Sequence, residues 1–154
     1  MRRRDDLWLR DLYDSQWSSM VQLATLLLGS SSLAEEVVQD ALVATHQRRQ
    51  QFITDRHARA YLRTAVVNRT RAAHRERIVD PAADRADEHA PVLAAIDTLP
   101  QRQREVLVLR YWGEASESEV AETLGISRNA VRTQTQRGVQ AVRIALAGAR
   151  WTHA

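Results

Sequence analysis

The chain has 154 residues, of which 44% are hydrophobic and 27% charged, with a formal net charge of +3; this is the balance of a globular protein with one or two small domains. It contains no cysteine, which excludes disulfide frameworks, thiolate zinc sites and a cysteine nucleophile. No apolar run approaches the ~20 residues that span a bilayer, and acidic residues interrupt the apolar core that a signal peptide would need, so we expect a cytoplasmic protein without membrane insertion.

Residues 1–78 predict a small helical bundle. Apolar residues spaced three and four apart indicate a first helix that Gly29 ends, and the Ser32–Glu35 pattern is typical of a capping box that opens a second. A third helix is predicted from Ala58 to about Arg77, with arginines on its outer side. The inward residues expected of the first helix are Leu9, Leu12, Tyr13, Met20, Leu23, Ala24 and Leu27.

Residues 79–97 form an acidic strip between two basic parts of the chain. The strip holds one arginine against five acidic residues, and Pro81 and Pro91 fall within it. We interpret it as a linker, with Val92, Leu93 and Ile96 indicating a short helix at its end.

Residues 98–154 predict a helix-turn-helix. A helix over Gln101–Trp112 is followed by a second capping box, Ser116–Glu119, and by a short helix that Gly125 ends. Ser127 can cap a long last helix, and the short and long helices joined by a glycine turn form the motif. The alternative is a plain helical hairpin. Either way, the fold class is all-α, with two small helical domains joined by an acidic linker.

The last helix presents polar groups on the side opposite Val131. Amide, hydroxyl and guanidinium groups in its first turns suit the major groove, where Asn and Gln pair with adenine and Arg with guanine. A merely solvated polar face is the alternative for any one residue. The candidate DNA-reading residues are Arg128, Asn129, Arg132, Thr133, Gln136 and Arg137.

The basic residues of the chain are all arginine, which suits phosphate binding but also fits the codon bias of a GC-rich genome. Five of them (Arg59, Arg63, Arg69, Arg71 and Arg75) follow the third helix and could supply a cationic groove for a single strand. Phe52, in the preceding loop, could stack on a base or anchor that loop. The histidines lack metal-ligand spacing, and no carboxylate pair, nucleophile–base set or phosphate loop occurs, so we expect no metal, no cofactor and no enzymatic activity.

Two stretches of sequence resemble a known family. Leu99–Val106 through Ile126–Thr133 resembles the C-terminal domain of sigma-70 family initiation factors, and Ala34–Ala41 followed by Ala60–Arg69 resembles their N-terminal promoter-melting domain. With only these domains and a short linker, the chain resembles an extracytoplasmic-function sigma factor. The resemblance implies a sigma factor that binds core RNA polymerase, recognises promoter DNA and directs transcription initiation, with region 2 at 1–78, a linker at 79–97 and region 4 at 98–154.

The resemblance also implies roles for individual residues. Glu36, Gln39 and Asp40 would dock on the clamp helices of the largest polymerase subunit, and the last helix would read the minus-thirty-five element. The polymerase flap and an anti-sigma factor are further implied partners. The loop over 49–57 would capture a flipped base of the minus-ten element. The residues implied in minus-ten recognition and melting are Phe52, Arg59, Arg63, Asn68, Arg71 and Arg75.

The span of a promoter tests this assignment. The two promoter elements lie about 85 Å apart, and a fully extended 19-residue linker spans at most ~60 Å. About 15 Å from each domain makes the reach just sufficient.

Three residues depart from the family pattern in the last helix. Thr135 stands where leucine is usual, Gly138 where alanine is usual, and Gln134 replaces a common arginine. These departures indicate an unusual minus-thirty-five sequence or weaker reading of it. Two alternatives remain: a free-standing helix-turn-helix regulator, and a degenerate sigma-like chain that titrates polymerase or an anti-sigma factor.

Overall fold

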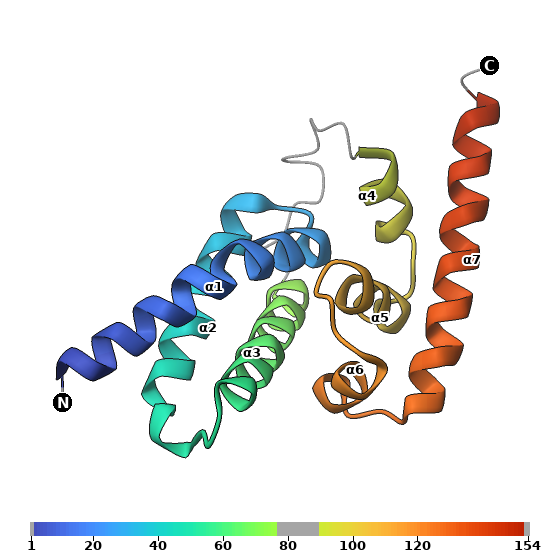
Figure 1. Ribbon diagram of the computed structural model, residues 1–154. Helices are drawn as coiled ribbons and strands as arrows, with labels where there is room; N and C mark the ends of the chain where they lie inside the picture. The colour runs from blue at the N-terminus through green and yellow to red at the C-terminus, as the bar shows by residue number, and fades with distance from the viewer. Residues whose placement is uncertain (1, 77–89, 153–154) are drawn as a thin grey trace.

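The computed structural model describes residues 2–76 and 90–152, and every element within them is helical, which confirms the all-α prediction. In chain order the elements are α1 (Arg2–Leu28), α2 (Ser31–Gln47), a 3-10 turn η1 (Arg49–Gln51), α3 (Asp55–Arg75), α4 (Ala90–Asp97), α5 (Gln101–Tyr111), α6 (Glu117–Leu124) and α7 (Arg128–Thr152). We call residues 2–76 the N-terminal block and residues 90–152 the C-terminal block. They lie side by side (Figure 1).

Helices α1, α2 and α3 form the predicted bundle, but the start of α2 differs from the prediction. Gly29 ends α1 with a left-handed φ of 77°. The next residue, Ser30, has the extended backbone of an N-cap, and its Oγ accepts a hydrogen bond from the backbone N–H of Leu33 at 3.3 Å. The capping box predicted at Ser32–Glu35 is therefore wrong, because the glycine turn places the cap two residues earlier.

Two further expectations for the N-terminal block are corrected. α3 begins at Asp55 rather than Ala58, because Thr54 has the extended N-cap backbone and accepts from the N–H of His57 at 3.2 Å. Tyr13, expected inward, is 44% exposed. Its ring stacks on Trp17 with centroids 4.9 Å apart, so the two rings cover each other at the surface instead of entering the core.

The helix-turn-helix forms as predicted. Ser116 and Glu119 make both hydrogen bonds of the capping box that opens α6. Gly125 ends α6 with a left-handed φ of 67°, a conformation that glycine adopts without steric cost. Ser127 then accepts from the N–H of Ala130 at 3.0 Å, so that α7 begins directly after the turn.

Helix α4 makes the maximum span of residues 79–97 shorter than the sequence analysis assumed. Residues 77–89, which include most of the acidic strip, lie outside the described residues. The remainder, Ala90–Asp97, is the predicted short helix, which packs on α7 and buries Ile96. Eight helical residues span ~12 Å rather than ~26 Å. The estimate that treated all of 79–97 as extended is therefore too long by about 14 Å.

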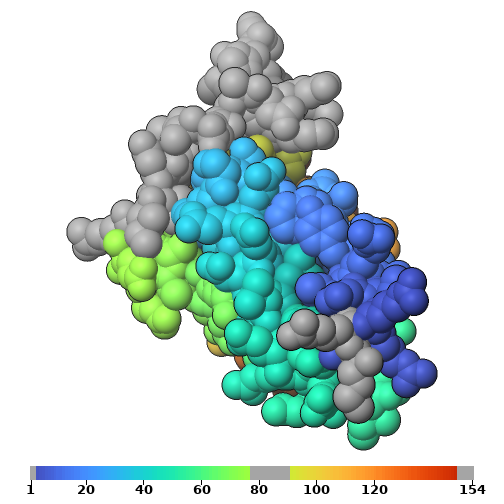
Figure 2. Space-filling view, turned by 90° about the vertical axis from the view of Figure 1, so that its left-hand side faces the viewer, coloured from blue at the N-terminus to red at the C-terminus, as the bar shows by residue number. Residues whose placement is uncertain are grey.

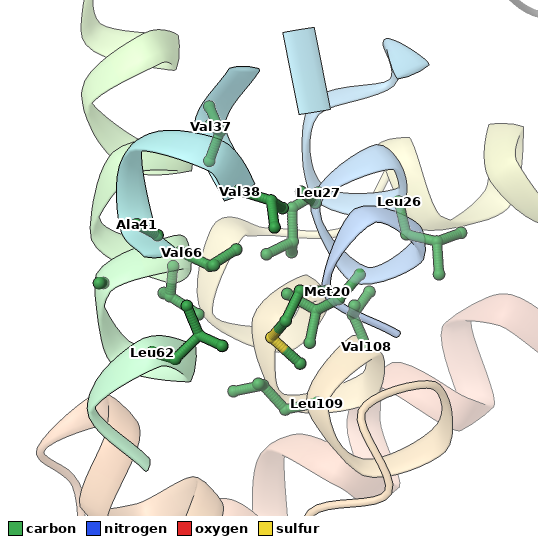
Figure 3. Packing of buried hydrophobic residues seen from close by; sticks show 14 of the residues in the cluster. Met20, Leu26, Leu27, Val37, Val38, Ala41, Leu62, Val66, Val108 and Leu109 are labelled. Atoms are coloured by element: carbon green, nitrogen blue, oxygen red, sulfur yellow. The ribbon is translucent and has the colours of Figure 1, made fainter. Parts of the chain in front are cut away.

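The two blocks share one hydrophobic core. In Figure 3, Leu62 and Val66 of α3 and Met20 of α1 point toward Val108 and Leu109 of α5. All five are buried. The sequence suggested two small helical domains joined by a linker, and in this structure the two blocks also pack directly against each other.

Two glycines of the C-terminal block allow close packing. A Cβ at Gly113 would lie 2.8 Å from the carbonyl oxygen of Leu109 and 3.0 Å from Cδ1 of Leu23 in α1. A Cβ at Gly138 would lie 2.9 Å from Cγ of Leu107. The glycine at 138, which departs from the family pattern, therefore lets α7 approach α5 closely and is not simply a weak point of the helix.

Candidate DNA and polymerase interfaces

The six residues predicted to read DNA lie together on the outer side of α7. All are exposed, whereas Val131 in the same turns is fully buried. They occupy about the first three turns of the helix. The exposed set is Arg128, Asn129, Arg132, Thr133, Gln136 and Arg137.

Arg132 is held in place by the neighbouring helix. Its Nε donates to Oε2 of Glu117 in α6 at 2.8 Å, while its side chain remains 57% exposed. Because only Nε is used in this contact, the two terminal nitrogens stay available to a base edge or a phosphate. The helix-turn-helix thus orients its most prominent guanidinium.

The polar residues predicted on α3 do not share one environment. Arg59, Asn68 and Arg75 are exposed, as DNA binding requires. Arg71 instead contacts Glu105 of α5: its Nε and Nη2 donate to Oε2 and Oε1 at 2.6 and 2.7 Å. The side chain of Glu105 is only 3% exposed, and its bidentate contact raises the pKa of Arg71.

Arg63 makes a second contact of this kind. It is buried, and its Nη1 donates to Oε2 of Glu119 in α6 at 3.3 Å. The other carboxylate oxygen of Glu119 accepts from the backbone N–H of Ser116 at 3.2 Å. This backbone bond first, and Arg63 to a smaller degree, lower the pKa of Glu119. The groove expected from five arginines is therefore divided, with two of them occupied by the C-terminal block.

The spacing along α3 separates the exposed residues as well. At about 100° per residue, Asn68, Arg71 and Arg75 fall within about 60° of one another around the helix, whereas Arg59 lies about 180° from Asn68. Arg59 instead lines a cavity of about 270 Å³ between α1 and the start of α3, with Trp8 of α1 opposite.

The loop before α3 carries two apolar residues, Phe52 and Ile53, and sequence reasoning considered only Phe52. Phe52 is half-buried and lies tilted against Tyr61, with ring centroids 5.4 Å apart, and Arg48 covers the Tyr61 ring at 5.5 Å. In this structure Phe52 therefore anchors the loop, one of the two roles considered. The next residue, Ile53, is 87% exposed. An isolated exposed isoleucine has no sequence signal, because exposure depends on where the loop packs.

The residues predicted to contact polymerase lie on the outer side of α2. Glu36, Gln39 and Asp40 are exposed, and Val37 and Val38 between them are buried against the bundle. Figure 2 looks onto this side of the N-terminal block, where α2 is open to solvent beside α1. This surface is free of the C-terminal block.

An apolar cavity of about 300 Å³ marks the C-terminal block. Ile96 of α4, Leu107 and Tyr111 of α5, and Val139 and Val142 of α7 are among its lining residues.

Within the described part of the chain, no cluster of His, Asp and Glu could hold a metal ion. No described helix is both long and apolar enough to cross a membrane.

Comparison with known proteins assigns both blocks. The family model for sigma-70 region 2 matches residues 12–77, and that for sigma-70 region 4 matches residues 89–142. The RNA polymerase sigma-E factor of Streptomyces avermitilis is 32% identical over 123 residues, covering 71% of this chain and 69% of its own length. The chain belongs to the extracytoplasmic-function sigma factors of the sigma-70 family.

This sigma factor binds core RNA polymerase, recognises promoter DNA and directs transcription initiation. It is also similar to the ECF RNA polymerase sigma factor SigL of Mycobacterium tuberculosis, at 28% identity over 90% of this chain and 88% of that protein. The structure of CnrH in complex with the cytosolic domain of CnrY covers 91% of this chain and 88% of CnrH, with a TM-score of 0.77 and 26% identity. The match to region 2 leaves no room for the free-standing helix-turn-helix regulator.

Sequence reasoning missed the two glutamates of this sigma factor that occupy Arg71 and Arg63. A signal was present for Glu105, which lies one helical turn before Leu109 and so on the buried side of α5. A carboxylate in that position needs a cationic partner. Its partner belongs to the other block, 34 residues away, and nothing in the local sequence indicates which arginine it is.

Proposed function

We propose that α7 reads the minus-thirty-five element through Arg128, Asn129, Arg132, Thr133, Gln136 and Arg137. The observation that carries this assignment is their joint exposure on one side of a helix that a well-formed helix-turn-helix presents. Arg132, held by Glu117, is the residue best placed for a bidentate contact to guanine. Two of the three departures from the family pattern, Thr135 and Gly138, lie on the inner side of α7, and the third, Gln134, is not among the six proposed readers.

The N-terminal block opens promoter DNA at the minus-ten element. Asn68 and Arg75 on α3 are exposed near each other around the helix and can hold a displaced strand by amide and guanidinium contacts. Arg59, on the opposite side of α3, lines the cavity between α1 and the start of α3, where an unstacked base could enter. Phe52 supports the loop before α3 by packing against Tyr61. When the C-terminal block moves away, Arg71 joins the side of α3 that carries Asn68 and Arg75, and Arg63 joins the side that carries Arg59.

Helix α2 docks on the clamp helices of the largest polymerase subunit. Its exposed polar residues Glu36, Gln39 and Asp40 form a surface that neither α3 nor the C-terminal block covers. Asp40→Arg reverses the charge of that surface without touching the core, so holoenzyme formation should fall while the melting curve is unchanged. Equal polymerase binding by the unchanged protein and the Asp40→Arg variant in a pull-down would refute this assignment.

The C-terminal block contacts the polymerase flap through the apolar cavity between α4, α5 and α7. An exposed apolar hollow of about 300 Å³ is suited to apolar side chains of a partner. It lies beyond the reading turns of α7, since Val139 and Val142 follow the last proposed reader, Arg137. Both blocks can therefore hold polymerase while α7 remains on DNA.

An anti-sigma factor restrains this protein by covering its polymerase-binding surfaces. Support comes from CnrH, whose structure was solved in complex with the cytosolic domain of CnrY. The sigma factor is itself non-enzymatic and acts in the cytoplasm, where the polymerase supplies the chemistry. Residues 79–97 then serve as the linker between its two functional regions.

Run-off transcription tests the proposal as a whole. Purified protein is added to core polymerase on a library of upstream regions, and the transcripts are sequenced from their 5′ ends. Defined start points preceded by two shared sequence elements are expected. Binding to core polymerase without any defined start would instead support the degenerate, titrating sigma-like chain.

A further inference from the structure

We propose that the α3 surface assigned to promoter DNA has a second occupant within the same chain: the carboxylates of Glu105 and Glu119, which exclude DNA from Arg71 and Arg63 while the blocks are packed. This inference rests on the proposed role of α3 in DNA binding. The two occupants share one chemistry, because a guanidinium holds a carboxylate or a phosphate through the same pair of parallel N–H bonds.

The Arg71–Glu105 contact leaves no room for a phosphate. Both of its hydrogen bonds are short, at 2.6 and 2.7 Å, and they use the fork that would face a phosphate. The Arg71 side chain is 26% exposed and that of Glu105 only 3%. A DNA strand can reach this guanidinium only after α5 has moved away from α3.

The rest of the interface has the character of a contact that can open. Its apolar part is well packed, since Leu23 of α1 lies against Gly113 and Met20 lies among Val108 and Leu109. Its polar part is less complete: the buried Nε of Arg63 has no hydrogen-bond partner among the described residues, and the Glu119 side chain is 29% exposed. Domains of one chain are expected to move relative to each other unless their interface is large and wholly hydrophobic, and these polar contacts make this interface only partly hydrophobic.

The packed arrangement cannot occupy both promoter elements. The longest helix, α1, has 27 residues and spans ~40 Å, against about 85 Å between the two elements. The blocks must therefore separate on a promoter, and separation frees Arg63 and Arg71. Meanwhile the polymerase-binding residues Gln39 and Asp40 stay exposed in the packed state. Polymerase can therefore reach α2 while Arg63 and Arg71 of α3 are still occupied by the C-terminal block.

The experiment compares two double variants of the full-length chain. E105Q/E119Q neutralises the two occupants, and glutamine is accepted at the third position of a capping box, so α6 keeps its start. E114Q/E122Q removes the same two charges from exposed positions of the same block. For each we measure the radius of gyration by small-angle X-ray scattering, and the affinity for a short mixed-sequence single-stranded DNA by fluorescence anisotropy.

The expected result is a larger radius of gyration for E105Q/E119Q only, against about 15 Å for a compact chain of this length. Its affinity for the single strand should rise at least about fivefold over the control variant, a usual size for coupling between sites. No expansion would overturn the proposal, because the carboxylates would then not hold the blocks together. Expansion without higher affinity for the single strand than the control variant would overturn the DNA role of α3. The claim that the two carboxylates hold the blocks together would then remain. E119Q against E122Q repeats the comparison without altering the buried Glu105.

Discussion

Helices α7 and α3 carry similar sets of polar side chains, yet the structure treats them differently. The six candidate readers of α7 are all exposed, and the one strong contact among them, Arg132 with Glu117, comes from the adjacent helix of the same motif. On α3, Arg63 and Arg71 are held by glutamates of the other block. The polar side of a helix thus shows which residues face away from the bundle to which the helix belongs. It does not show whether a second block covers them.

Arg71→Ala should have the largest effect, because it leaves the nearly buried carboxylate of Glu105 without its cation. Removing one partner of such a buried pair should destabilise the packed arrangement of the two blocks by about 3 kcal/mol. We expect a lower melting temperature and an expanded chain in scattering. Arg75→Ala, which removes an exposed arginine one turn later, is the matched control and should leave both unchanged. Equal behaviour of the two variants would remove the distinction between α3 and α7.

Arg132→Ala should show the opposite profile. Its ion pair is exposed, so the loss of stability should stay within ~1 kcal/mol. Promoter discrimination should fall by about 1–3 kcal/mol at one upstream base pair, measured as transcription from a set of single-base promoter variants. A uniform loss on every promoter would show that Arg132 binds a phosphate instead.

Asn68→Ala tests the exposed part of α3 without disturbing the interface between the blocks. We expect several-fold weaker promoter opening, seen as reduced permanganate reactivity of thymines, with little change in closed-complex affinity. The reason is that an exposed amide contacts the strand only once it is displaced. A defect confined to closed-complex binding would contradict the melting role.

Gly138→Ala reports on the packing beneath the reading side of α7. Replacing a helical glycine with alanine normally stabilises by about 0.5–1 kcal/mol. Here the added methyl group would lie 2.9 Å from Leu107, so we expect a loss of about 1 kcal/mol in urea unfolding instead. Gly148→Ala, in open space on the same helix, supplies the control and should not destabilise.

The smallest effect concerns pH. The pKa of Glu119 lies below its ordinary value of 4.5 because the Ser116 backbone N–H and, less strongly, Arg63 favour its charged form. Its contribution is therefore complete above about pH 4.5 and is lost as the pH falls through the lowered value. Expansion of the chain on acidification should be weaker in E119Q, which has no such carboxylate. An identical pH profile for both proteins would assign the acid response to other groups.

Much of the N- and C-terminal architecture could be predicted because local chemistry decides it. The capping box of Ser116 and Glu119, the left-handed Gly125 and the cap at Ser127 each depend on residues within one turn. The start of α2 was misplaced because three consecutive serines, 30–32, offer equivalent caps. There the backbone direction set by Gly29 made the choice.

The sequence by itself determined the helices, the helix-turn-helix, the side of α7 that faces outward and the family to which the chain belongs. Only the tertiary structure decided that Gly138 serves a close approach to Leu107, and that Glu105 and Glu119 occupy two arginines of α3. The physical reason is the separation along the sequence over which each kind of interaction acts. Helix periodicity and capping act over three or four residues, whereas these contacts join positions 31 to 56 residues apart in the sequence. The two arginine–glutamate contacts exist only once the two blocks have packed.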